Sequence, residues 1–136
     1  MAVTLSSSRP GTTEFIAMRA ACGWGEISED MAQRALGQTV ATVTAHDGDS
    51  LIGFGRVVGD GALYFYLQDI IVAPSHRGQG VADAIITRLL DEIAPFTGPG
   101  STIGLMAAKG VEPLYERFGF RRRPADSLGA GMTKLC

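Results

Sequence analysis

The sequence predicts an α+β fold, a single domain in which short helices pack on a mostly antiparallel sheet. Apolar and β-branched residues gather or alternate, as they do in strands, at residues 40–45, 51–58 and 62–72. Apolar residues recur at helical spacing at residues 81–93. The chain has 136 residues, of which 46% are hydrophobic, so it has the size of one domain with its own core, and we treat residues 1–136 as that domain.

Charge and cysteine content exclude several classes of protein. The formal net charge is −2, whereas a duplex-binding domain usually carries a basic excess that neutralises phosphates. Cys22 and Cys136 are too few for a disulfide framework and lack metal-ligand spacing. No apolar stretch approaches the ~18 residues of a membrane span, and the N-terminus lacks the pattern of a secretion signal. We therefore expect a cytoplasmic protein that binds no nucleic acid, membrane or metal.

The N-terminal part predicts one strand followed by two short helices. Residues 2–8 alternate in part and end before a Pro-Gly pair. Thr12 or Thr13 can cap the first helix, which the Gly-Trp-Gly run at residues 23–25 interrupts. A serine followed by two acids at residues 28–30 gives the N-cap and first-turn signals of the second helix. The tryptophan therefore lies in a loop between the two helices.

Three antiparallel strands are predicted in succession after these helices. Residues 40–45 and 51–58 flank a His-Asp-Gly-Asp run at residues 46–49, which has the composition of a tight turn. A second turn, Gly-Asp-Gly at residues 59–61, leads into the long strand at residues 62–72.

Helices and strands are mixed in the rest of the chain. The amphipathic helix at residues 81–93 is followed by a strand at residues 101–107 and a short helix at residues 111–118. Two closing strands are expected at residues 120–123 and 131–135. The complete fold is then expected to hold about four helices and a sheet of six to seven strands.

A glycine-bearing loop joins the long strand to the amphipathic helix. It reads His-Arg-Gly-Gln-Gly-Val-Ala at residues 76–82. Backbone N–H groups and the helix dipole converge at such a helix start and bind anions, and glycines let the backbone approach phosphates. The spacing is not Gly-x-Gly-x-x-Gly, and no Lys-Ser or Lys-Thr pair follows, so a Rossmann or Walker A site loses its support. The loop predicts a site of another class.

With the elements around it, the loop resembles the acetyl-CoA motif of the GNAT superfamily of N-acetyltransferases. In that motif Gln or Arg is followed by x-x-Gly-x-Gly or Ala, and Arg77, Gly80 and Ala82 match it. The family also has a long strand before the loop, an amphipathic helix after it, and a later Tyr followed by Gly-Phe, which here are Tyr115 and residues 119–120. The order of elements agrees over essentially the whole chain.

The resemblance implies an enzyme, an N-acetyltransferase with the GNAT fold. Acetyl-CoA would be the co-substrate, and the acceptor would be a primary amine of a small molecule or peptide that attacks directly in a ternary complex. The alternatives are a transferase that uses another acyl-CoA, a non-catalytic CoA-binding or sensor module, and a plain interaction domain. The family and the apolar final strands also suggest a homodimer.

The resemblance also implies where the cofactor binds. In the family the strand before the loop is bulged and splays from the following strand, and pantetheine enters the gap as an added strand. Main-chain groups of Ile70 and Val72 would bind the pantetheine amides and the acetyl carbonyl, and would stabilise the oxyanion. The implied cofactor-binding residues are Ile70, Ile71, Val72, Arg77, Gly78, Gln79, Gly80, Val81, Ala82 and Asp83.

Two residues are candidates for proton transfer. Tyr115 is the candidate general acid for the leaving thiolate, with a packing aromatic as the alternative. Asp69, beside the expected bulge, is the candidate general base, unless it faces away from the cleft. Many members of the family place an asparagine seven residues before the tyrosine; Ala108 stands there in this chain, and Lys109 is an alternative cofactor contact.

Three residues are candidates for the acceptor site. Trp24 lies in the segment that roofs the acceptor in the family, and Tyr66 and Gln68 share a face of the long strand. Packing in a core is the alternative for both aromatic rings. The sequence does not identify the amine.

Overall fold

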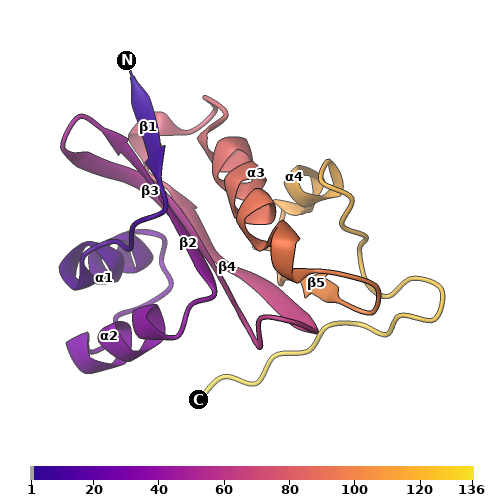
Figure 1. Ribbon diagram of the computed structural model, residues 1–136. Coiled ribbons are helices and arrows are strands. Elements are labelled where there is room, and N and C mark those ends of the chain that lie inside the picture. The colour runs from indigo at the N-terminus through magenta and orange to yellow at the C-terminus, as the bar shows by residue number, and fades with distance from the viewer. Residues whose placement is uncertain (1) are drawn as a thin grey trace.

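Five strands form one sheet in the order β1-β2-β3-β4-β5, and helices cover both of its faces (Figure 1). The computed structural model describes residues 2–136. The strands are β1 (Val3–Ser6), β2 (Ala41–Asp47), β3 (Ser50–Gly59), β4 (Tyr64–Val72) and β5 (Thr102–Gly104). The helices are α1 (Thr12–Ala21), α2 (Glu29–Gly37), α3 (Val81–Ile93) and α4 (Glu112–Glu116), with 3-10 turns η1 (Pro74–His76) and η2 (Ala94–Phe96).

The helix starts follow local signals in the sequence. Ser28 caps α2, where its side chain accepts a hydrogen bond from the backbone N–H of Met31 at 3.1 Å. At α1 the N-cap is Gly11 rather than a threonine, and the Glu14 side chain accepts from the Gly11 N–H at 3.3 Å. Within residues 2–136, no helix combines the length and the apolar character needed to cross a membrane.

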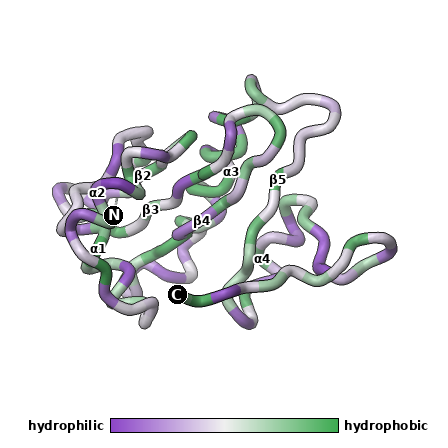
Figure 2. Tube along the Cα trace, turned by 90° about the horizontal axis from the view of Figure 1, so that it is seen from below, coloured by the Kyte–Doolittle hydropathy of each residue, from purple (hydrophilic) through white to green (hydrophobic). Residues whose placement is uncertain are grey.

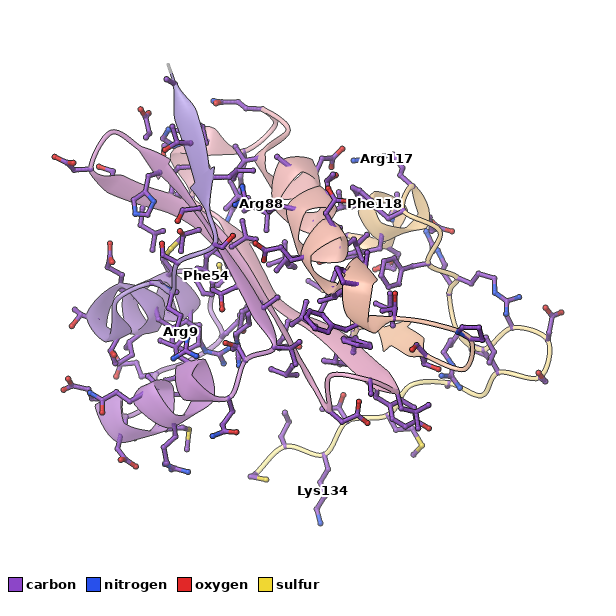
Figure 3. All side chains as sticks on the ribbon, in the orientation of Figure 1. Arg9, Phe54, Arg88, Arg117, Phe118 and Lys134 are labelled. Carbon is purple, nitrogen blue, oxygen red and sulfur yellow. The ribbon has the colours of Figure 1, made fainter. Side chains whose placement is uncertain are left out.

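The two faces of the sheet carry separate cores. On one face, α3 buries Ile85, Ile86 and Leu89 against β2, β3 and β4. On the other, Phe15 of α1 is buried against Phe54 of β3, with the ring centroids 5.3 Å apart. Figure 3 shows Phe54 on the side of the sheet that α1 covers. The central strands β3 and β4 are therefore packed on both faces.

The number of strands is smaller than the six to seven expected. Residues 120–123 and 131–135 form no strand in the described part of the chain, so the prediction of two closing strands was wrong. In the first segment, Arg121 and Arg122 stay in solvent and pair with acids, and Arg123 donates to the carbonyl of Gly129; the second segment is exposed. The α+β class, the four helices and the three successive antiparallel strands are confirmed.

The last strand is also shorter than predicted. β5 forms only over Thr102–Gly104, whereas residues 101–107 were expected. A strand of this length offers few backbone groups to a further neighbour, which explains why the sheet ends there. In Figure 1 the yellow C-terminal segment runs below β4 and β5 as an extended trace. The homodimer inferred in part from the final strands stays a prediction.

A β-bulge in β4 opposite Gly55 sets the geometry of the site. The neighbours of Gly55 in β3 pair with residues 71 and 68 of β4, so two residues, Asp69 and Ile70, face one. Asp69 has a φ of 55°, in the left-handed region that few non-glycine residues adopt. A Cβ at Gly55 would lie 2.6 Å from Cδ1 of Ile70, so a larger residue there would require neighbouring side chains to shift. The bulge that the resemblance implied is confirmed.

The bulge moves the side chains of β4 from one face of the sheet to the other. Before it, Phe65 belongs to the core beneath α3, whereas after it Ile71 belongs to the core beneath α1 and α2. At the bulge itself, Gln68 and Asp69 both face α1 and α2, although they are consecutive residues. Two polar side chains of β4 are thereby brought to one side.

Candidate active site

β4 and β5 separate after three residue pairs. The two parallel strands pair only from Tyr64↔Thr102 to Tyr66↔Gly104. Beyond that point, within the described chain, no strand pairs with residues 67–72 along this edge of β4. Figure 2 shows the chain after β5 leading away towards α4. Unpaired N–H and C=O groups at such an edge can bind an extended ligand as an added strand. The expected splay of the two strands is confirmed.

A cleft of about 330 Å³ opens where this edge of β4 meets the start of α3. Gly80, the N-cap of α3, has a φ of 80°, and Gly78 has a φ of 74°. The first bond of the helix runs from the N–H of Ala84 to the carbonyl of Gly80 at 3.1 Å. Among the described residues, the N–H groups of residues 81–83 therefore make no intrahelical bond and are available to an anion. This glycine-loop cleft is lined by Val72, His76, Arg77, Gly78, Gly80, Val81, Ala82, Asp83 and Arg117.

Most of the predicted cofactor residues line the glycine-loop cleft. The exceptions are Ile70, Ile71 and Gln79. The Ile71 side chain is buried beneath α1 and α2, whereas Ile70 packs against the core beneath α3. Arg77 donates from Nε to the carbonyl oxygen of Val72 at 3.1 Å, so its guanidinium lies across the end of the free β4 edge. For all of the predicted cofactor-binding residues, the contacts with a cofactor stay predictions.

A series of side-chain hydrogen bonds connects the loop to the end of β2. His76, which is 8% exposed, has its Nε2 2.9 Å from Oδ2 of Asp47 and its Nδ1 2.7 Å from Oγ of Ser75. These contacts fix the 3-10 turn that precedes the glycines. The sequence places His76 in the loop but gives no sign of its pairing with Asp47, which lies 29 positions earlier.

One arginine reaches the cleft from the C-cap of α4. Arg117 donates from Nη2 to Oδ1 of Asp83 at 2.6 Å, and Figure 3 shows it on the α4 side of the first turn of α3. An acid in the first turn complements the helix dipole but would oppose a bound diphosphate. Arg117 offsets that charge. We did not predict this residue, because nothing local in the sequence directs it towards α3.

Tyr115 is half-buried on α4. Its ring packs edge-on against Phe120 with centroids 6.1 Å apart, and it joins the core beneath α3. Burial raises the pKa of the Tyr115 phenol, so the group keeps its proton at neutral pH. Tyr115 is not one of the residues that line the glycine-loop cleft, and Lys109 is exposed in the turn before α4. The roles predicted for both residues stay predictions.

A second cavity of about 390 Å³ lies on the α1 and α2 side of β4. It contains the predicted acceptor residues Tyr66 and Gln68. Burial raises the pKa of Tyr66, and a backbone hydrogen bond with Met106 lowers it in part. Trp24 does not line this cavity but packs on a residue that does, Arg19, whose guanidinium carbon lies 5.6 Å from the indole ring centroid. The second cavity is lined by Phe15, Arg19, Ile27, Met31, Ala35, Arg56, Val58, Tyr66 and Gln68.

Two arginines in the second cavity hold the side chain of Asp69. Arg19 Nη1 lies 2.5 Å from Oδ1, and Arg56 Nε lies 2.6 Å from Oδ2. The Asp69 side chain has 0% exposed area, and those of the arginines have 19% and 12%. Asp69 therefore faces the cavity side, but both of its oxygens already accept from guanidinium groups. Its role as a base stays a prediction.

Neither arginine was among the predicted site residues. Arg56 is the single charge in the predicted strand at residues 51–58, and a charged residue within an apolar strand is a usable signal. Arg19 lies in a helix with apolar neighbours, where an arginine on a solvent-facing side is equally common. Their meeting at Asp69 depends on the bulge, whose effect on the direction of the Asp69 side chain the sequence does not show.

Fold and site together define a class of protein. The bulged β4 parts from β5, an anion-binding cleft lies at the start of α3, and a second cavity opens beside the bulge. This arrangement suits a transferase that binds an acyl-CoA along β4 and an acceptor next to it. The chain belongs to the GNAT acetyltransferase family, because the family model described as an acetyltransferase (GNAT) domain matches residues 18–133. Acetyl-CoA is the co-substrate of that family, and acetyl transfer is its general chemistry.

Similar proteins come from plants and bacteria. Serotonin N-acetyltransferase 2, chloroplastic, of Oryza sativa subsp. japonica is 33% identical over 97 residues, which is 71% of this chain and 41% of that protein. This chain thus spans less than half the length of that relative. A probable acetyltransferase of unknown function from meticillin-resistant Staphylococcus aureus has a crystal structure that matches with a TM-score of 0.88 at 30% identity, over 98% of this chain and 100% of that one. A GNAT family acetyltransferase from Streptococcus pneumoniae TIGR4 matches with a TM-score of 0.79 at 23% identity, over 99% and 98% of the two chains, and shows the fold alone.

Proposed function

We propose that this chain is an N-acetyltransferase that moves an acetyl group from acetyl-CoA to a primary amine, which attacks directly in a ternary complex. The observation that carries the proposal is the position of the two openings along β4. The glycine-loop cleft begins at Val72 and the second cavity includes Gln68, about 10 Å apart along the strand, because their partners in β3 are three residues apart. A cofactor bound along this edge would present its thioester near the bulge, beside an amine in the second cavity.

The cofactor is held mainly by backbone groups in this proposal. The N–H groups at residues 78–83 bind the diphosphate, and the guanidinium groups of Arg77 and Arg117 add positive charge at the mouth of the cleft. The pantetheine arm pairs with the free edge of β4, using the main chain of Ile70 and Val72. These groups bind the diphosphate and the pantetheine arm, which all acyl-CoA thioesters share. They therefore support cofactor binding without selecting the acyl chain.

The transfer step needs a neutral amine, an oxyanion site and a proton for the thiolate. The amine nitrogen attacks the thioester carbonyl carbon, a C–N bond forms, and a backbone N–H of β4 donates to the oxyanion. The C–S bond then breaks, and Tyr115 gives its phenolic proton to the leaving thiolate. The proton that the amine loses passes to water at the cavity. The raised pKa of Tyr115, caused by burial, keeps the acid in its proton-bearing form.

Asp69 has a positioning role in this proposal. Both of its oxygens accept from arginines, so its charge is used to hold those two side chains. The alternative, a general base that takes the amine proton, predicts a different response to pH. The Asp69→Asn variant separates the two roles.

Binding and release of CoA together test the proposed function. Acetyl-CoA is expected to raise the melting temperature of the protein, since a ligand that binds the native state stabilises it. A panel of primary amines is then scored for acetyl-CoA-dependent release of free thiol, with propionyl-CoA and succinyl-CoA as matched thioesters. Binding with no thiol release by any amine would identify a non-catalytic CoA-binding module. Absence of any shift with acetyl-CoA would leave a plain interaction domain.

A further inference from the structure

Charge in the second cavity is unbalanced. Two guanidinium groups, those of Arg19 and Arg56, line it, and among the described residues no carboxylate does. Asp69 lies behind them and supplies one negative charge. One positive charge is therefore left in excess, on side chains that are less than one-fifth exposed. A largely desolvated excess charge attracts a counter-ion more strongly than a charge in open solvent.

Both guanidinium groups are fixed in place and keep free donors. Arg19 stacks on the rings of Phe15 and Trp24, with its guanidinium carbon 5.9 and 5.6 Å from their centroids, and Arg56 lies 5.7 Å from the Phe15 centroid. Among the described residues, nothing accepts from Nη2 of either arginine, and the buried Nε of Arg19 also lacks an acceptor. The protein alone thus leaves the hydrogen bonding of Arg19 incomplete, in an otherwise rigid setting.

We propose that the acceptor of this enzyme is a small primary amine that also carries an anionic group, a carboxylate or a phosphate, bound by Arg19 and Arg56. A planar guanidinium fork matches the oxygens of either group. The apolar lining, which includes Ile27, Met31 and Val58, and the volume of about 390 Å³ suit a small amine with an apolar part. This inference rests on the proposed function, which it extends to a class of substrate.

The anionic group of the acceptor offsets this excess positive charge when it binds. The two arginines therefore hold and orient the acceptor, and the proton that its ammonium group loses before attack on the thioester passes to water. The ammonium of an amine with no anionic group would be repelled by the two guanidinium groups, and such an amine would have no ion pair with them to compensate.

Matched pairs of amines test this proposal. Phenylalanine is compared with phenylalaninamide, and phosphoethanolamine with ethanolamine, by the kcat/KM for thiol release with acetyl-CoA. The anionic member of at least one pair is expected to be favoured by about tenfold or more, and the pair that responds distinguishes carboxylate from phosphate. The amide has the more easily deprotonated amine, so amine basicity does not explain a preference for the acid.

Variants connect the preference to the arginines. Arg19→Gln is expected to raise the KM of the anionic acceptor by about tenfold or more, with acetyl-CoA binding unchanged. Arg19→Lys, which keeps a charge opposite Asp69, guards against loss of folding and is expected to lose part of the preference. Arg34→Gln is the control, because Arg34 is 69% exposed on α2 and pairs with Asp30 away from the cavity.

Two outcomes overturn the inference in different ways. Turnover of the amines that lack an anionic group at equal or higher kcat/KM, or an unchanged preference in Arg19→Gln, would contradict the anionic acceptor while the proposed function stands. Binding of acetyl-CoA with no thiol release by any amine, with or without an anionic group, would overturn the proposed function and this inference with it.

Discussion

Asp69 and Arg56 form an ion pair at the bulge, with Oδ2 2.6 Å from Nε, although Arg56 is paired with Gln68 in the strand register. The extra residue in β4 turns Asp69 to the face that carries Arg56. Arg56 also donates to the carbonyl of Ala35 in α2 at 3.3 Å. The pair therefore connects the bulge, and with it the proposed site of the thioester, to the wall of the second cavity.

Replacing Asp69 by Asn is expected to lower the free energy of unfolding by about 3 kcal/mol. The change leaves two largely buried guanidinium groups without a counter-charge. Urea unfolding measures it. Asp30→Asn is the control, because the Asp30–Arg34 pair is exposed and its loss is expected to change stability by less than about 0.5 kcal/mol.

The same variant separates the two roles of Asp69. A general base must be ionised to accept a proton. If Asp69 is the base, the kcat/KM of the parent falls as the pH falls, and the pH profile of the Asn variant lacks this fall at acid pH. Normal stability with a lost acid limb would establish Asp69 as the base. Reduced stability with an unchanged pH profile is what the positioning role predicts.

Replacing Gly80 by Val is expected to abolish most of the thermal shift caused by acetyl-CoA. The φ of 80° is strained for a β-branched residue, so the loop would move its N–H groups away from the diphosphate. Crowding is not the cause, since a Cβ there has no described atom within 4 Å. Gly80→Asn is the matched control, because asparagine tolerates the left-handed region, and it should retain more of the shift. Parental affinity in both variants would rule out the glycine loop as the diphosphate site.

Arg117→Ala is expected to weaken acetyl-CoA binding about fivefold, or about 1 kcal/mol, because the cleft loses a positive charge that also neutralises Asp83. Asp83→Asn should strengthen acetyl-CoA binding, since it frees Arg117 for the diphosphate. Calorimetric titration measures both. Arg121→Ala is the control, because Arg121 pairs with Asp126 and is 62% exposed. Weaker binding in Asp83→Asn would contradict a diphosphate at this position.

Tyr115→Phe is expected to lower kcat by about 10²-fold and to leave the KM for acetyl-CoA nearly unchanged. The variant keeps the ring that packs on Phe120 and removes only the proton donor. Burial raises the pKa of Tyr115, so the kcat of the parent should fall when the pH rises through the raised pKa. The pH profile of the variant should lack this fall at alkaline pH. Reduced stability with normal kcat would show instead that Tyr115 is only a core residue.

Local signals in the sequence predicted the glycine-loop cleft. The glycine loop and the start of α3 depend on neighbouring residues, so the pattern at residues 76–82 was enough to place them. The closing strands failed because strand formation at residues 120–123 and 131–135 depends on a partner edge, which the short β5 does not provide. Alternation alone does not show whether such an edge exists.

The arrangement of side chains in the second cavity could be predicted only in part. Arg19 and Arg56 lie 50 and 13 positions from Asp69, so their meeting is a long-range property of the fold. Strict alternation along β4 would also put Gln68 and Asp69 on opposite faces, and only the bulge brings them together. Trp24 was predicted at the acceptor site from the resemblance; its ring packs on Arg19, which lines the second cavity, and its contact with an acceptor stays a prediction.

The most direct test of the proposed transfer is a steady-state assay of thiol release from acetyl-CoA, with the N-acetyl product identified by mass spectrometry. The parent protein is expected to release CoA only when an amine is present and to form one N-acetylated amine per thiol released. Gly80→Val should lose this activity through weakened cofactor binding, and Tyr115→Phe through a lower kcat. Acetyl-CoA that binds in the glycine-loop cleft yet yields no acetylated amine, with any acceptor of either charge class, would contradict the assignment of this chain as an N-acetyltransferase.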